Sequence, residues 1–271
     1  MSTCYCFKGS SSDPAYEPQG ALSALAGLPI YRSTPHDKDT NSHRDVILYL
    51  PDGFGLAKHN QRLADKYAQC GYETVVVDYF EGDALPDTFM LYTPGTDLDV
   101  YDNLSSEQKE TIRKIDMPNW LEQHNPEHIS SLVDKFFPEF CSTITGDKQG
   151  PKPRIHILGH CFGGKHAFKL AQLDQESIGS ILVFHPSFLE PSDIKNLKKP
   201  ILVGCAETDV FTPDLIQTML NHLPKCGAAW KFLVYGGTQH GFATRPDLGN
   251  ELTAKMFQEA FDDGLRWLRA N

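Results

Sequence analysis

The residues Gly159-His160-Cys161-Phe162-Gly163-Gly164 carry the strongest chemical signal in the chain. They follow an apolar, β-branched run and precede a helical pattern. A reactive side chain on a sharp strand-to-helix turn needs small residues two positions before and after it, and Gly159 and Gly163 meet this need. The N-terminus of the following helix favours a thiolate. The pattern predicts that Cys161 is a nucleophile. The alternative is a Gly-rich structural turn that happens to hold a Cys.

A thiol nucleophile needs a base and an acid that orients the base. Asp209 and His240 each follow a later apolar run, and His240 stands in a Gly-flanked loop. We expect Asp209 to fix the tautomer of His240, and His240 to hold the thiolate of Cys161. Glu207 and Asp214 are alternatives for the acid.

The elements that must position these residues are apolar runs and amphipathic stretches in alternation. The runs show little alternation of polar and apolar residues, which is typical of parallel strands buried on both faces. They cover residues 45–50, 74–78, 154–158, 181–184, 201–204 and 230–235, with an outer strand near 28–31. Helical patterns cover residues 58–70, 163–173, 213–223 and 250–270. This order predicts an α/β fold, with a mostly parallel twisted sheet and helices on both faces.

Residues 79–150 interrupt the alternation. They combine an acidic loop and Pro-containing turns with helical patterns over residues 105–115 and 126–141. We expect one domain over residues 1–271, with 79–150 as a helical insertion between strands. The insertion forms either a cap over the active site or a decoration of one sheet edge.

Composition narrows the classes of partner. The chain has 271 residues with 25 Lys and Arg against 35 Asp and Glu, a formal charge of −10, so we expect no nucleic-acid partner. No apolar run reaches the roughly 20 residues that cross a bilayer, and the N-terminus lacks a secretory pattern. Seven Cys indicate free thiols in a reducing, cytoplasmic setting. Cys4 and Cys6 have no matching pair, so we expect no metal and no cofactor. The expected state is a monomer or weak homodimer.

A second motif, Pro51-Asp52-Gly53-Phe54-Gly55, follows the first long apolar run. Together with Gly-His-Cys-Phe-Gly-Gly, an Asp 48 residues after the Cys and a His 31 residues further on, it resembles the dienelactone hydrolase family of the α/β-hydrolase superfamily. The resemblance covers roughly residues 27–270.

The resemblance implies an α/β-hydrolase fold and hydrolysis of a lactone or related ester through an acyl-enzyme. It implies a triad of Cys161, Asp209 and His240 and an oxyanion hole made by the backbone N–H groups of Phe162 and Gly53.

By the same resemblance, Asp52 is the acid that holds the resting thiol, although the family usually has the longer Glu at this position. Arg245 is a candidate for binding substrate, but it lies slightly farther from His240 than the corresponding Arg of the family. His185 and Phe54 are further candidates for lining the pocket.

Three functions are consistent with these residues. The first is a cysteine-dependent hydrolase of a small-molecule lactone or ester. The second is a thioester or ester hydrolase, or a cyclase, that releases an acyl chain in secondary metabolism. The third belongs to another class: a non-catalytic, redox-sensing thiol protein.

Overall fold

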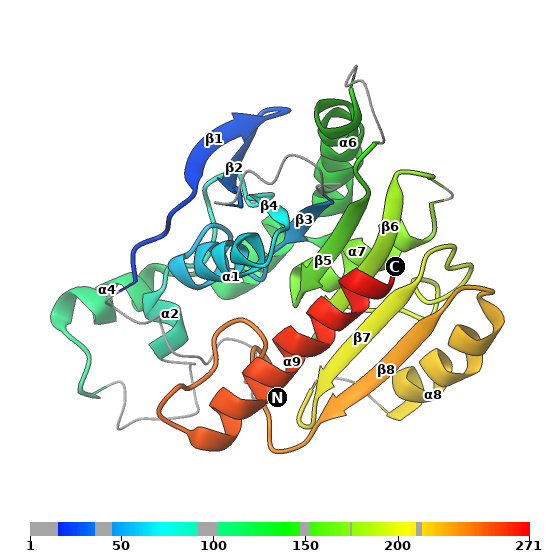
Figure 1. Cartoon of the computed structure of the whole chain (residues 1–271). Coiled ribbons are helices and arrows are strands. Elements are labelled where there is room, and N and C mark those ends of the chain that lie inside the picture. Colours follow the sequence, from blue (N-terminus) through cyan, green and yellow to red (C-terminus); the bar gives the residue numbers. More distant parts are fainter. Residues whose placement is uncertain (1–15, 36–44, 92–101, 147–151, 174, 210–212) are drawn as a thin grey trace.

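In the computed structural model, eight strands form one sheet (Figure 1). The structure describes residues 16–35, 45–91, 102–146, 152–173, 175–209 and 213–271. The strands are β1 (Ala21–Leu25), β2 (Leu28–Ser33), β3 (Val46–Leu50), β4 (Glu73–Val77), β5 (Ile155–His160), β6 (Ile178–Phe184), β7 (Ile201–Ala206) and β8 (Trp230–Tyr235). Their order is β1-β2-β4-β3-β5-β6-β7-β8, and the six strands from β4 to β8 pair in parallel. The predicted mostly parallel sheet is confirmed.

Helices cover both faces of this sheet (Figure 1). The longer ones are α1 (Lys58–Gln69), α6 (Pro126–Thr145), α7 (Phe162–Ala171), α8 (Pro213–His222) and α9 (Glu251–Ala270). Helices α1 and α9 share one apolar cluster with one face of the strands, and α6, α7 and α8 share another with the opposite face. The helices on both faces are therefore also as predicted. None of the described helices is both long and apolar enough to span a membrane.

The edge of the sheet beyond β4 is an antiparallel hairpin. The outer strand predicted near residues 28–31 is β2, which runs antiparallel to β4. It also pairs with β1, an exposed strand that was not predicted from the sequence.

Between β4 and β5 the chain forms α2 (Thr88–Leu91), α4 (Ser106–Lys114) and α5 (Met117–Gln123) before α6. Ser105 caps α4 in a capping box with Gln108, which agrees with the predicted helix start. Helix α6 buries a long apolar row in the main core cluster, so it is an ordinary crossover helix. The additional structure within residues 79–150 therefore lies before α6. The expected single domain stays a prediction, and Cys4 and Cys6 lie outside the described residues.

The start of α7 packs tightly against the end of β3. A Cβ atom on Gly163 would lie 2.0 Å from the carbonyl oxygen of Leu50, far inside van der Waals contact. Only glycine fits there without moving the backbone.

We expect Gly163→Ala to destabilise the fold by about 3 kcal/mol, because the added methyl forces α7 away from β3. For a chain of this size the melting temperature should fall by roughly 5–10 °C in calorimetry. Gly236→Ala is the control, because its Cβ would meet no described atom closer than 3.7 Å. An unchanged melting temperature for Gly163→Ala would contradict the tight contact.

Candidate active site

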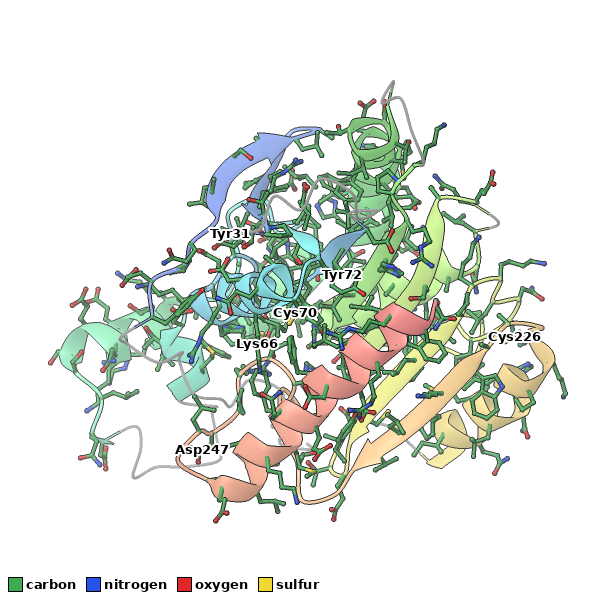
Figure 2. The ribbon with its side chains drawn as sticks, viewed as in Figure 1. Tyr31, Lys66, Cys70, Tyr72, Cys226 and Asp247 are labelled. Carbon is green, nitrogen blue, oxygen red and sulfur yellow. The ribbon has the colours of Figure 1, made fainter. Side chains whose placement is uncertain are left out.

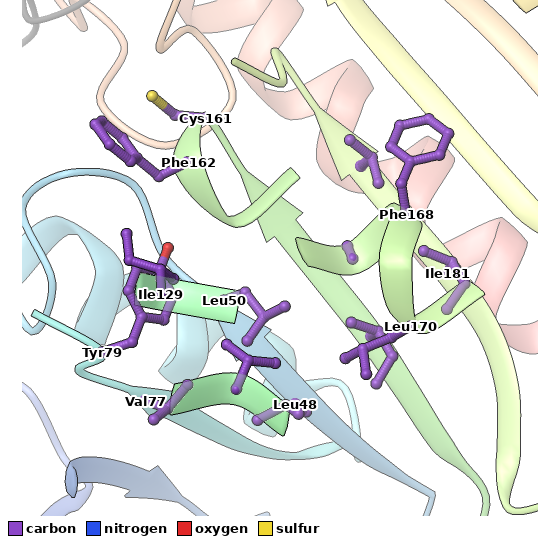
Figure 3. Packing of buried hydrophobic residues seen from close by; sticks show 14 of the residues in the cluster. Leu48, Leu50, Val77, Tyr79, Ile129, Cys161, Phe162, Phe168, Leu170 and Ile181 are labelled. Atoms are coloured by element: carbon purple, nitrogen blue, oxygen red, sulfur yellow. The ribbon is translucent and has the colours of Figure 1, made fainter. Parts of the chain in front are cut away.

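Cys161 lies on a strained turn between β5 and α7. Its backbone has φ 51° and ψ −113°, a conformation that residues with side chains rarely adopt. Its N–H donates to the carbonyl of Phe184 at 3.3 Å, and its own carbonyl accepts from the N–H of Ser187 at 2.9 Å. Figure 3 shows the sulfur pointing away from the buried apolar side chains, with Phe162 beside it. The turn thus presents the thiol at the carboxyl edge of the sheet.

The predicted acid and base meet at the same edge. His240 Nδ1 lies 2.5 Å from Asp209 Oδ1, and both side chains are almost completely buried. The other carboxylate oxygen of Asp209 accepts the N–H of Ala206, the last residue of β7. Thr208 donates from its N–H and its hydroxyl to the carbonyl of Thr238, which ties the loop after β7 to the loop after β8.

Of the two alternative acids, Glu207 is exposed and accepts the N–H of Gly237 instead. The side chain of Asp214 lies outside the described residues. Among the described carboxylates, the structure brings Asp209 to His240.

The electrostatics of His240 differ from those of a simple buried imidazole. Burial alone would lower the pKa of His240, but the charge of Cys161 and the hydrogen bond with Asp209 outweigh burial. Together they raise the pKa of His240 to about 9. The site therefore favours a protonated imidazole of His240 near neutral pH.

Ser187 is a residue that the sequence reasoning missed. Its hydroxyl oxygen lies 3.3 Å from Cys161 Sγ and 3.5 Å from His240 Nε2, and the side chain is buried. A single Ser in the loop after β6 has no characteristic spacing to another residue that would indicate its role. Its position follows from the backbone hydrogen bond to Cys161.

His185, a candidate pocket residue, packs behind the imidazole of His240. The two ring centroids are 4.7 Å apart, and neither ring nitrogen of His185 has a hydrogen-bond partner among the described residues. Burial, aided by the charge of His240, lowers the pKa of His185 well below its ordinary value. The ring is therefore neutral and acts as a wall for His240. His160 is also buried and stacks on Phe184.

The structure does not bring Asp52 to the thiol. Its carboxylate accepts hydrogen bonds from Asn60 Nδ2 at 2.8 Å, His59 Nε2 at 3.1 Å and Arg245 NH1 at 2.7 Å. Thr244 also donates to this carboxylate. Burial would raise the pKa of Asp52, but the charges of His59 and Arg245 hold it well below its usual range.

The expected contact between Asp52 and Cys161 is thus replaced by contacts with His59, Asn60 and Arg245, whose donors fill the space around the short side chain. The guanidinium of Arg245, a candidate for substrate binding, is engaged by Asp52 and lies over the ring of Phe54, 5.2 Å from its centroid. Phe54 itself is buried.

Gly53 and Phe162, the two candidate oxyanion donors, lie next to each other. A Cβ atom on Gly53 would meet the ring of Phe162 at 3.4 Å. The rings of Phe80, Trp120 and Phe188 pack on that of Phe162, with centroids 5.7, 5.6 and 5.0 Å away. Trp120 belongs to α5, so the additional structure before α6 contacts the residue that follows the candidate nucleophile.

Residues 31–271 match the dienelactone hydrolase family. The chain belongs to this family. The expectation from the two sequence motifs is therefore confirmed, and so is the expectation of an enzyme of the hydrolase class.

Two fungal relatives are similar over nearly the full length of this hydrolase. It is 28% identical to hydrolase pyvD of Aspergillus violaceofuscus over 97% of this chain and 94% of the relative. It is also 28% identical to dienlactone hydrolase 1 of Gibberella moniliformis, over 93% and 88%. A crystal structure of dienelactone hydrolase from Anabaena variabilis is similar with a TM-score of 0.56 at 15% identity, over 90% and 96% of the two chains. The last similarity supports the α/β-hydrolase fold alone.

We expect the pKa of His240 to depend on the sulfur. In Cys161→Ala the contribution of the sulfur is lost while burial and the contact with Asp209 remain, so the pKa should fall from about 9 toward the ordinary value of 6.5. The measurement is an NMR titration of the imidazole ring. In Cys141→Ala, which removes a buried Cys on α6, the pKa should stay near 9. A value near 9 in Cys161→Ala would count against a charged pair.

Proposed function

We propose that this protein cleaves a small lactone or ester through an acyl-enzyme formed on Cys161. The observation that carries the proposal is the chain of contacts from Asp209 through His240 and Ser187 to the sulfur of Cys161. In this reading Asp209 orients the ring, and His240 and the thiol exist as an ion pair before substrate binds.

The first half-reaction forms the acyl-enzyme. The thiolate of Cys161 attacks the carbonyl carbon of the substrate, and the carbonyl oxygen takes the electron pair of its π bond. The backbone N–H groups of Phe162 and Gly53 stabilise this oxyanion, with each donor contributing about 3–4 kcal/mol. When the carbonyl reforms, the bond to the alkoxide oxygen breaks and the proton on His240 Nε2 passes to that oxygen.

The second half-reaction releases the acid. His240, now neutral, accepts a proton from water as the water oxygen attacks the thioester carbon. Collapse of the second tetrahedral intermediate breaks the bond to sulfur and returns the thiolate of Cys161 and the protonated imidazole. If the substrate is a lactone, the released alcohol and acid belong to one molecule.

The aromatic wall beside Phe162 indicates the kind of substrate. Phe188 is 47% exposed and packs on the ring of Phe162, while Trp120, which also packs on that ring, is buried. Planar or apolar acyl groups gain most from such surroundings. Because Arg245 is engaged by Asp52, a substrate without a carboxylate fits this site better than a small anionic one. We also propose that α5, which carries Trp120, forms part of the cap expected over the site.

Ser187 has a positioning role in this proposal. Its hydroxyl accepts from His240 Nε2 and donates to the thiolate of Cys161, which steadies the ion pair until substrate arrives. We propose a reducing, cytoplasmic setting for such a thiol. Cys70, Cys141, Cys161, Cys205 and Cys226 are free cysteines in the described part of the chain.

The function is tested with 4-nitrophenyl acetate and a panel of aryl esters and lactones. Wild type should turn over and accumulate an acyl adduct on Cys161 in mass spectrometry, and Cys161→Ala should have neither property. His240→Ala should lower kcat about 10²–10⁴-fold, since base catalysis is typically of this size. His128→Ala is the matched control, because His128 is exposed, and it should leave kcat unchanged.

Turnover that survives in Cys161→Ala would overturn the acyl-enzyme. A wild-type protein that forms no adduct and cleaves nothing on the panel, yet loses its thiol to peroxide at Cys161, would instead support the redox-sensing function.

The positioning role is tested by the pH dependence of Cys161 alkylation with iodoacetamide. Loss of a hydrogen bond to a charged group costs about 1.5–3 kcal/mol, so Ser187→Ala should shift the profile upward by about one pH unit. Ser187→Thr should restore much of it. Ser180→Ala removes a buried hydroxyl on β6 that bonds to His156, and it should leave the profile in place. A profile for Ser187→Ala that overlays wild type would refute the role.

A further inference from the structure

A cavity lies between α1, α9 and the loop that follows His240. Its volume is about 290 Å³, at the small end of the range for ligand pockets. Cys161, Phe162 and His240 do not line it, and Arg245, which does, is paired with Asp52. The described lining contains no acidic residue, although the chain as a whole carries a formal charge of −10. Arg62 and Lys66 therefore give this cavity a cationic lining.

The charged side chains at the cavity come from successive turns of α1. Lys66 lies against α9 (Figure 2). Its ammonium is 4.7 Å from the ring centroid of Phe257 and 4.1 Å from that of Phe261. It donates to Gln258, and no carboxylate of a described residue lies within 4.0 Å of it. Burial lowers the pKa of Lys66 from its usual range. Arg62 lies one turn earlier and also lines the cavity.

The remaining lining combines apolar side chains with the polar side chains of Tyr16, Gln69 and Thr244. Leu63 and Phe257 form walls, while His59 and Arg245 stand at the end next to Asp52. His59 Nε2 bonds to Asp52, but its Nδ1 is buried with no hydrogen-bond partner among the described residues. The side chain of His59 is 2% exposed. Buried polar atoms usually have a hydrogen-bond partner. The unpartnered Nδ1 of His59 therefore indicates a place where a polar group of a ligand would bind.

We propose that this cavity binds a small carboxylate with an apolar, planar body. The carboxylate would accept hydrogen bonds from Lys66 and Arg62, as charge-assisted pairs of this kind are the stronger ones. The body would lie between Leu63 and Phe257, where an aromatic ring gains contact with another ring. A cation is disfavoured by the positive charges of Lys66 and Arg62.

The probe is benzoate, titrated by calorimetry into the full chain without substrate, so the result does not depend on the proposed function. Benzamide has the same shape without the charge, and it should bind at least tenfold more weakly. Lys66→Met keeps most of the apolar stem and should weaken benzoate about tenfold, while Lys66→Arg should retain binding. Arg62→Met is the second variant and should weaken benzoate in the same direction.

Lys195→Met is the matched control, because Lys195 is exposed and is not part of the cavity lining. Its affinity for benzoate should equal that of wild type. Melting temperatures of all variants show that they are folded. No measurable binding to wild type, equal binding of benzamide, or an affinity unchanged in both Lys66→Met and Arg62→Met would each overturn the proposal. Since Lys66 lies outside the candidate active site, binding of benzoate beside Cys161 would appear as this last outcome.

Discussion

The contact between Gly163 and the end of β3 sets the geometry of the edge of the sheet. There is no room for a side chain between Gly163 and the carbonyl of Leu50, and the N–H of Gly163 donates to the carbonyl of Pro51 at 3.2 Å. The first turn of α7 is thereby held against the segment that follows β3. Cys161 stands two residues before Gly163, and Gly53 stands two residues after Pro51, so both flank this contact. The contact therefore sets how far apart the thiol and both candidate oxyanion donors lie.

The two sides of this edge are held by different forces. On the side of Asp52, a buried carboxylate is surrounded by donors from α1 and from the loop after His240. Burying such charges is costly unless each is paired, and removing one partner leaves an uncompensated charge. On the side of Phe162, the contacts are between aromatic rings, which tolerate small shifts. The backbone near Gly53 is therefore held by stronger interactions than the aromatic wall beside Phe162.

Much of the framework could be predicted from sequence because its signals are local. The unbroken apolar runs marked the parallel strands, and Ser105 with Gln108 marked the start of α4. Strand β1 was not predicted because four of its five residues are exposed and its sequence, Ala-Leu-Ser-Ala-Leu, contains no β-branched residue. The role of α6 escaped for a different reason. Its amphipathic pattern was visible, but a pattern does not tell whether the apolar face meets a sheet or a cap.

The site shows the same division between local and distant signals. Cys161, Asp209 and His240 each follow a strand of the parallel part of the sheet, and parallel strands bring their carboxyl ends together. Two partners of Asp52, His59 and Asn60, lie seven and eight residues away on α1, but Thr244 and Arg245 lie 192 and 193 residues away, so no local spacing could indicate the whole set. The short side chain of Asp52 ends among those donors, whereas the family resemblance placed it at the thiol.

The positive φ of Cys161 limits which side chains this position accepts. A β-branched residue at such a backbone conformation is a steric outlier, so threonine is unsuited to the turn although it carries a hydroxyl. Serine and cysteine remain as the small nucleophiles that fit, and they differ by one atom. An exchange between them would leave the shape of the site intact and change its charge, because a serine hydroxyl stays neutral where the sulfur raises the pKa of His240. Evolution along this lineage can thus alter the resting protonation of the site without refolding any part of the backbone.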